Sequence, residues 1–177
     1  MASISDVKGN IELIKQSYKK ALALGEGVTG DEFVMTIEGY PDLRYLIQST
    51  QIPGLTRENI ESYGPLGVQF NQQGRFKNAQ DISVTFKEVI SGKAYKALRS
   101  WVKNKEYKKV VIGIVGESSP TSTTDTTVVL EDCWIEIEAA DLSVEDGATI
   151  FKPSGTLHVN WVGHLDDDAS STVSIGG

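Results

Sequence analysis

The feature that most constrains this chain is a strand pattern followed closely by a helix pattern, over residues 81–102. Apolar and polar residues first alternate, as in a β-strand with one buried face. The apolar members are Ile82, Val84 and Phe86. The spacing then becomes helical, with Ser91 as the expected cap and an apolar stripe of Ala94, Leu98, Trp101 and Val102. Because so short a helix is unstable alone in water, we expect it to cover the sheet, with Leu98 and Trp101 in the core.

Length and composition favour one globular domain with appendages. The chain has 177 residues, of which 40% are hydrophobic and 8% aromatic. No run approaches the ~20 apolar residues of a transmembrane helix, and the N-terminus lacks a signal-peptide core, so we expect a soluble protein made inside the cell, without membrane contact. Beyond residues 81–102 the patterns are those of strands, which predicts one helix inside a β-rich body.

A second helix pattern occupies the N-terminus, roughly Ser5 to Leu24, followed by a glycine-rich linker from Gly25 to Asp31. Its apolar stripe consists of Val7, Ile11, Ile14, Tyr18, Ala21 and Leu22. Burying this stripe contributes on the order of 10 kcal/mol gross, so we do not expect it to stay exposed. Two arrangements are open: the helix packs on its own sheet, or it is an arm that docks on a neighbouring subunit.

Two short strand patterns flank the turn at Gly39 to Asp42 and predict a hairpin. Their apolar residues are Phe33, Met35 and Ile37 before the turn, and Leu43, Tyr45 and Ile47 after it. Farther on, residues 60–63 and 68–70 flank a glycine-rich tip, and a polar loop follows at residues 71–80. We expect the region from Leu66 to Gln80 to project from the core, where neighbours in a repeating assembly touch.

The C-terminal half predicts three strands. Residues 107–116 form a strand covered on both faces, followed by a Ser/Thr-rich loop at residues 116–127. The next strand changes phase at Glu131 and Asp132, which indicates a bulge or a crossing between two sheets. In the last strand one face carries Leu157, Val159 and Trp161. We expect Trp161 and also Trp134 in the core.

The sequence offers no convincing catalytic or metal-binding set. Neither phosphate-binding glycine pattern occurs, nor does a GxSxG motif. His158 and His164 would lie ~20 Å apart on an extended strand and could not share a metal without a sharp bend. Glu136 and Glu138 share one strand face about 7 Å apart, which we interpret as a solvent-facing side rather than a glycosidase pair. With Cys133 as a buried inert thiol, we predict no enzyme activity, no metal and no cofactor.

Charge is unevenly distributed along the chain. The formal net charge is −7, although residues 1–24 carry a surplus of two positive charges. Tight binding of nucleic acid needs clustered Lys and Arg, so the acidic body argues against it. Such a body is compatible with a surface that repels DNA, and also with ordinary solubility.

The order of these elements resembles the tail tube proteins of contractile-tailed bacteriophages, whose relatives include the tube of the type VI secretion system. Three phrases carry the resemblance: IPGL at residues 52–55, the strand and helix at residues 82–102, and CWIEIEAADLSVEDGATIFKPSGTLHVNWV at residues 133–162. The match spans Asp31 to Asp167. The N-terminal helix is not part of the family's core pattern.

The resemblance implies a β-sandwich or partly closed β-barrel with one inserted helix, here with an added N-terminal amphipathic helix. It divides the chain into an arm and linker (1–30), a tube-type domain (31–167) and a flexible tail (168–177). The family assembles as hexameric rings stacked into a hollow tail tube of the virion, built in the host cytoplasm, and DNA passes through its lumen without specific binding. An acidic lumen would suit that passage.

The partners implied are other copies of the chain and the sheath, baseplate and tape-measure proteins. We expect inter-subunit contacts from the N-terminal helix, the projecting region and the loop at residues 116–127. The candidate contact residues are Val7, Ile11, Ile14, Tyr18, Phe70, Arg75 and Phe76.

Two other functions remain open. The chain could be a baseplate-proximal tube initiator, because such proteins resemble the tube protein with added arms. It could also be a carbohydrate-binding β-sandwich that uses Trp134 or Trp161 as a stacking platform. Exposed tryptophans would favour that module.

Overall fold

The computed structural model describes residues 10–25, 27–116, 126–145 and 147–164. The chain separates into two compact units, Met1–Asp31 and Glu32–Gly177, and each is described by itself. In chain order the elements are α1 (Ile11–Ala23), β1 (Phe33–Ile37), β2 (Ile47–Thr50), β3 (Arg57–Tyr63), β4 (Gln69–Phe76), β5 (Gln80–Phe86), α2 (Lys93–Lys103), β6 (Lys108–Ile114), β7 (Val128–Ile137), β8 (Ser154–Val159) and β9 (Trp161–His164).

In the first unit, α1 begins after Asn10, whose side-chain oxygen accepts a hydrogen bond from the backbone N–H of Leu13 at 3.1 Å. This contact satisfies one of the free amide groups of the first turn. The helix ends just before Gly25, which has a φ of +96°. The predicted helix is therefore present, and its expected start at Ser5 lies outside the described residues.

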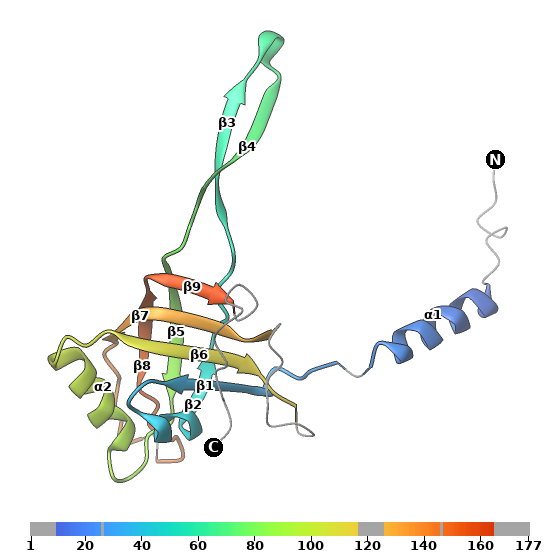
Figure 1. The fold of residues 1–177 in the computed structure, drawn as a ribbon. Coiled ribbons are helices and arrows are strands. Elements are labelled where there is room, and N and C mark those ends of the chain that lie inside the picture. The colour runs from blue at the N-terminus through green and yellow to red at the C-terminus, as the bar shows by residue number, and fades with distance from the viewer. Residues whose placement is uncertain (1–9, 26, 117–125, 146, 165–177) are drawn as a thin grey trace. The chain divides into compact units, whose positions relative to one another are not determined.

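In the second unit, seven antiparallel strands form one sheet in the order β1-β6-β7-β8-β5-β2, with β9 also paired to β7. The sheet curves into a nearly closed barrel, with β1 and β2 at its two ends (Figure 1). The predicted class, a mainly β protein with a partly closed barrel, one inserted helix and one N-terminal helix, is confirmed.

β7 changes partners along its length. Residues 128–131 pair with β9, and residues 134–137 pair with β8. Between them Asp132 has a φ of 51°, and the register with β6 shifts so that Leu130 faces Val110 while Cys133 faces Lys108. The extra residue on β7 is a bulge, which reverses the side-chain alternation. The predicted bulge is confirmed; β7 does not cross between separate sheets, because all its partners belong to the same sheet.

The core of the barrel is covered by α2. The buried residues of this helix are Ala94, Leu98 and Trp101, and the indole N–H of Trp101 donates a hydrogen bond to the backbone oxygen of Glu106 at 2.9 Å. The prediction for Val102 is wrong, because this residue is exposed. At eight residues from Ala94, it lies at the rim of the apolar stripe rather than at its centre.

The start of α2 also differs from the sequence prediction. Ser91 does not cap the helix. The cap position is occupied by Gly92, which has a φ of 67° and no side chain to bond the first turn. The carboxylate of Glu88 accepts hydrogen bonds from the backbone N–H groups of Ala94 at 3.0 Å and Tyr95 at 2.6 Å. The link between β5 and α2 turns back far enough to place this anion at the positive end of the helix, where the helix dipole favours it.

The predicted hairpin between residues 33 and 47 is wrong. β1 pairs with β6 and β2 pairs with β5, at opposite ends of the sheet. Residues Pro41–Tyr45 form a 3-10 turn instead of the second strand, and Leu43 is buried. Pro41 suits the first position of such a turn because its φ is already helical and its missing N–H has no partner there.

The expectation that Trp134 and Trp161 lie in the core is also wrong, since they are 41% and 49% exposed. Trp134 lies on the outward side of β7, between the buried Cys133 and Ile135. The strand that should have carried Trp161 breaks at Asn160, whose side chain donates a hydrogen bond to the backbone oxygen of Asp132 at 2.9 Å. The break shifts the alternation, so Val162 is buried in place of Trp161.

Candidate assembly surfaces

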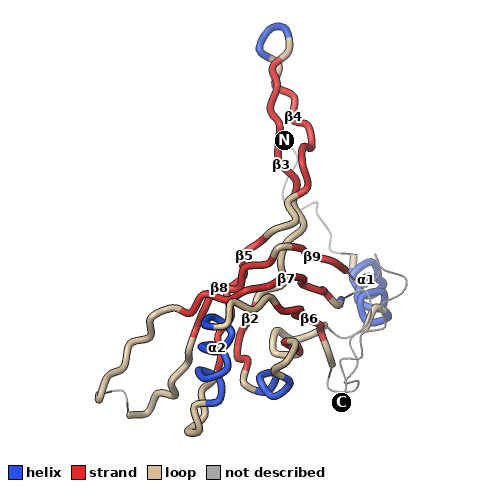
Figure 2. Tube along the Cα trace, turned by 60° about the vertical axis from the view of Figure 1, so that its left-hand side comes forward, coloured by secondary structure: helices blue, strands red, loops and turns tan. Residues whose placement is uncertain are grey.

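The hairpin of β3 and β4 is a separate two-stranded sheet that extends away from the barrel (Figures 1 and 2). All its strand residues are exposed except Gly74, which is half-buried. The prediction that this region projects is correct, but the expected polar loop at residues 71–80 is mostly strand. Alternation within β4 is masked in the sequence because its polar residues are Gln and Asn on both faces.

The tip of the hairpin is built on glycine. Leu66 and Gly67 have φ values of 62° and 77°, and the backbone N–H of Gly64 donates to the backbone oxygen of Val68 at 2.7 Å. The ring of Phe70 lies so close to Gly64 that a Cβ atom there would be 2.7 Å from the ring. The hairpin also exposes six large apolar side chains: Ile60, Tyr63, Leu66, Val68, Phe70 and Phe76. A two-stranded sheet cannot bury such groups by itself, so they are available to a partner.

The base of the hairpin is tied to the barrel by aromatic and polar contacts. The rings of Phe76 and Trp161 lie 6.4 Å apart, and the guanidinium of Arg57 lies 5.8 Å from the centre of the Phe76 ring. The side chain of Asn78 donates to the backbone oxygen of Asn160 at 2.8 Å, and Gln80 donates to the backbone oxygen of Gly54. These contacts hold the base of the hairpin in place.

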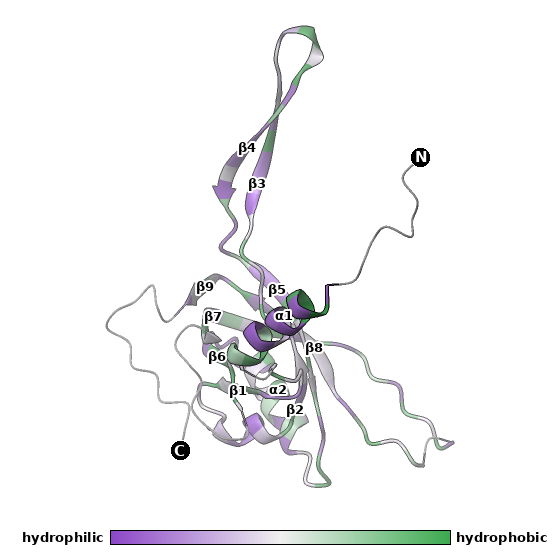
Figure 3. Cartoon of the chain, turned by 90° about the vertical axis from the view of Figure 1, so that its right-hand side faces the viewer, coloured by the Kyte–Doolittle hydropathy of each residue, from purple (hydrophilic) through white to green (hydrophobic). Residues whose placement is uncertain are grey.

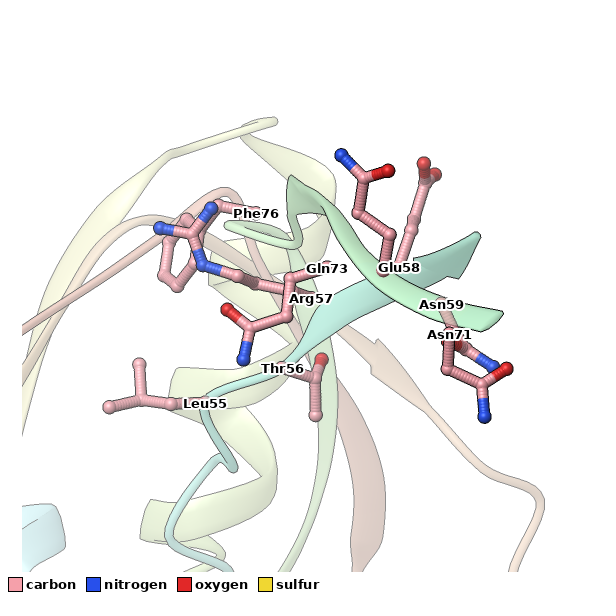
Figure 4. Close-up of a pocket in the computed structure, with 9 residues that line it drawn as sticks. Leu55, Thr56, Arg57, Glu58, Asn59, Asn71, Gln73 and Phe76 are labelled. Carbon is pink, nitrogen blue, oxygen red and sulfur yellow. The ribbon is translucent and has the colours of Figure 1, made fainter. Parts of the chain in front are cut away.

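An open pocket of about 490 Å³ lies at this base (Figure 4). Its lining residues are Leu55, Thr56, Arg57, Glu58, Asn59, Asn71, Gln72, Gln73 and Phe76. The lining is polar apart from Leu55 and Phe76, and it contains one cation and one carboxylate.

On α1, none of the helix residues is buried, and the apolar side chains that the sequence singled out, Ile11, Ile14 and Tyr18, are all exposed. Figure 3 shows that α1 carries both hydrophobic residues, in green, and hydrophilic residues, in purple. Val7 lies outside the described residues. Of the other candidate contact residues, Phe70 lies near the hairpin tip, whereas Arg75 and Phe76 lie at its base and are also exposed.

Cys133 and His158 have side chains of types that can act in catalysis or bind a metal, and both are held by contacts within the fold. Burial, reinforced by the negative charges of Asp132 and Glu131, raises the pKa of the Cys133 thiol to about 12. Nδ1 of His158 lies 2.7 Å from the carboxylate of Asp81, and its ring stacks on Trp134 with 4.0 Å between centroids. Among the described residues, no cluster of three His, Cys, Asp or Glu side chains could hold a metal.

This contact of His158 with Asp81 and Trp134 was not anticipated from the sequence. The three residues lie on adjacent strands β8, β5 and β7, where the register places Asp81 and Trp134 on either side of His158. Each residue occupies an outward position in its own strand, although Trp134 had been expected in the core. Strand order, which brings them together, was not visible in the sequence.

The sequence matches no family model and no curated protein. None of the helices in the described ranges has the length and apolar character needed to cross a membrane.

Solved structures share the fold over most of its length. A chain of the sheath-tube complex of PVC, an extracellular contractile injection system, has a TM-score of 0.61 at 14% identity and covers 81% of this chain and 95% of its own. A chain of the PVC sheath/tube terminator has a TM-score of 0.62 at 14% identity, covering 79% and 97%. A chain of the tube-terminating cap of the anti-feeding prophage, AFP, has a TM-score of 0.60 at 16% identity, covering 92% and 97%. This protein therefore has the fold found in the sheath-tube, terminator and cap structures of contractile injection systems, as its resemblance to tail tube proteins predicted.

Proposed function

We propose that this protein is a structural component of a contractile tail or injection particle, and that its copies assemble as stacked hexameric rings into the hollow inner tube. One observation carries the proposal: the fold of this chain matches chains of such particles over 95–97% of those chains' lengths. The match is one of fold, and the exposed surfaces of this chain supply a separate physical argument for assembly.

That argument rests on the exposed apolar side chains of the hairpin and on those along α1, which a single helix cannot bury by itself. The hairpin exposes Phe70 near its tip, and α1 exposes Ile11, Ile14 and Tyr18. Each large apolar side chain contributes about 1.5–3 kcal/mol when it is removed from water. In a closed ring or a stack of rings, every copy can donate these groups and accept those of a neighbour. The hairpin and α1 are therefore the proposed inter-subunit contacts, together with residues 116–127, most of which lie outside the described residues.

An acidic body would suit a tube that conducts DNA. With a net charge of −7, a lumen lined by this chain repels phosphates rather than binding them. The remaining partners, namely sheath, baseplate and tape-measure proteins, follow from the family resemblance. The particle, a virion tail or a related injection device, is the proposed location.

The proposal is tested by electron microscopy and light scattering of the purified full chain. Sixfold rings or tubes are expected, and their formation should be abolished by Phe70→Ser with Ile60→Ser on the hairpin. Thr85→Ser, on a barrel strand, is a matched control that should assemble normally. A chain that stays monomeric at high concentration, without and with a preformed tube as template, would contradict the proposal.

A role at the end of the tube is the nearest variant of this function. It is favoured by the cap, whose matched chain covers 92% of this one and has a TM-score of 0.60. A protein of the tube itself should form long tubes, whereas a cap, terminator or initiator should stop at one or two rings. The length distribution in micrographs separates these roles.

A second candidate function is carbohydrate binding, which the exposure of Trp134 and Trp161 favours. However, one face of Trp134 is covered by the ring of His158, and Trp161 contacts Phe76. Each tryptophan therefore offers only part of its surface for stacking on a sugar. A glycan array probed with the native protein and with Trp134→Ala would reveal such binding as a signal that the substitution removes.

A further inference from the structure

The outward face of α2 carries an unusual concentration of positive charge. The helix contains four cationic residues and no anionic one, whereas the rest of the chain carries −11. Lys93 is paired with Asp42. The other three, Lys96, Arg99 and Lys103, recur at helical spacing on one exposed face, and none of them makes an ion pair within the described residues. We refer to these three residues as the basic face.

The basic face is hollowed and partly apolar. Its three cations line an open pocket of about 460 Å³ together with Gly92, Tyr95, Ser100 and Asn104. Beside it, the side chains of Ile90, Tyr95 and Val102 are exposed. A face meant only for solvent needs neither a hollow nor exposed apolar groups, whereas a protein interface combines both with charge.

A complementary surface lies elsewhere on the same chain. Residues 128–151 contain no Lys or Arg and seven acidic residues. Six of these are exposed. Three of them lie on the outward side of β7 or continue its alternation, and they form what we call the acidic strip: Glu131, Glu136 and Glu138. None of them pairs with a Lys or Arg in the described part of the chain. The large apolar side chain of Trp134 is exposed on the same outward side of β7.

One chain does not bring these two surfaces together. α2 contributes to the same core as Cys133 and Ile135, so it packs on the inward side of β7. Trp134 and Glu136 alternate with these core residues and therefore point to the opposite side of the strand. The basic face, on the outer side of α2, is thus separated from the acidic strip by the helix and the sheet.

We propose that the basic face of one copy docks on the acidic strip of a second copy. Both surfaces carry exposed apolar groups and charges of opposite sign, and none of the three carboxylates pairs with a Lys or Arg among the described residues. They lie on different sides of one molecule. Such an interface is heterologous, because the two surfaces that meet are different. It closes into a ring when the rotation between neighbouring subunits is a whole-number fraction of 360°. The inference rests on the proposed self-assembly and names the two surfaces that meet between neighbours within a ring.

The test is a charge exchange in the full-length chain. Lys96→Glu with Arg99→Glu should weaken self-association by at least about tenfold, because like charges would then face each other. Glu136→Lys with Glu138→Lys should do the same. The chain that carries all four substitutions has the wild-type net charge and should recover self-association. Lys87→Glu with Lys152→Glu is the control, since it changes the net charge by the same amount as the α2 pair without changing a residue of the basic face or the acidic strip, and it should leave association unchanged.

The measurement is the association constant by analytical ultracentrifugation over a range of salt, with circular dichroism to show that each variant is folded. Wild-type association should weaken as the salt concentration rises, and the variant that carries all four substitutions should show the same salt dependence. If the wild type assembles and the α2 variant assembles equally well, the inference is wrong while the proposed function stands; the basic face would then be available to a different, acidic protein. If the two reversed pairs each weaken assembly but their combination does not restore it, the surfaces do not meet each other, which also overturns the inference. Failure of the wild type to associate at all overturns the proposed function and the inference with it.

Discussion

Replacing Trp101 by alanine tests how α2 is attached to the barrel. The side chain is 1% exposed, and its indole N–H donates to the backbone oxygen of Glu106 at 2.9 Å. Removing a buried tryptophan loses its transfer free energy and leaves a cavity, for a cost of about 3–5 kcal/mol. For a domain of this size, such a loss lowers the melting temperature by about 6–20 °C.

Two further variants separate packing from hydrogen bonding. Trp101→Phe keeps most of the apolar contact but leaves the Glu106 oxygen without its donor, so we expect a smaller loss, about 1–3 kcal/mol. Tyr95→Ala changes the exposed side of the same helix and should stay within about 0.5 kcal/mol of the native chain.

The assay is urea unfolding followed by circular dichroism, at one fixed and low protein concentration because self-association would stabilise the folded state. If the urea midpoints of both Trp101→Ala and Tyr95→Ala equal that of the native chain, α2 does not cover the core as described. An equal loss in both variants would mean that the stability of the helix, and not the packing of Trp101, decides the result.

Three other outcomes follow from the structure. Because the pKa of Cys133 is raised to about 12, roughly one thiol in ten thousand is ionised at pH 8, and a thiol reagent should react only when the chain unfolds; fast reaction in native buffer would argue against a buried site. Hydrogen bonds from Lys108 and Asn104 lower the pKa of Glu106 below its ordinary value of 4.5, so this carboxylate stabilises the fold fully above that pH and progressively less as the pH falls through its native pKa. Glu106→Gln should therefore destabilise the protein at pH 7 but not at pH 2, and an equal effect at both pH values would exclude the ionic contribution. Deleting residues 1–27 should leave a folded β domain by circular dichroism that no longer stacks; an unfolded product would place α1 in the core of its own subunit, and tubes of normal length would show that it is dispensable.

Patterns that depend on neighbours in sequence were predicted well. The alternation in β5 and the helical stripe of α2 identified Phe86, Leu98 and Trp101 as apolar residues of one surface, and all three are buried. The phase change at Asp132 correctly located the bulge in β7. These signals are local, because side-chain direction follows from backbone geometry over a few residues.

Predictions that required pairing partners failed. The segment from β1 to β2 looked like a hairpin, but nothing within it could reveal that β6 and β5 offer better partners farther along the chain. Trp161 appeared to continue the apolar face of β8 until Asn160 bonded to the bulge at Asp132 and broke the strand. Long-range contacts of this kind depend on the whole sheet, and so they are not written in the spacing of one segment.

The sequence by itself determined a β-rich body covered by one helix, the buried thiol and the projecting region, because hydrophobic spacing and glycine positions act locally. The partly closed barrel came from the family resemblance. Only the tertiary structure decided which surfaces are left for partners. It turned Trp134 and Trp161 outward, left the apolar side chains of the hairpin exposed, and separated the basic face of α2 from the acidic strip of β7. The physical reason is that exposure is a property of the assembled sheet: a residue is free to contact a partner only after strand order has chosen which neighbours cover it.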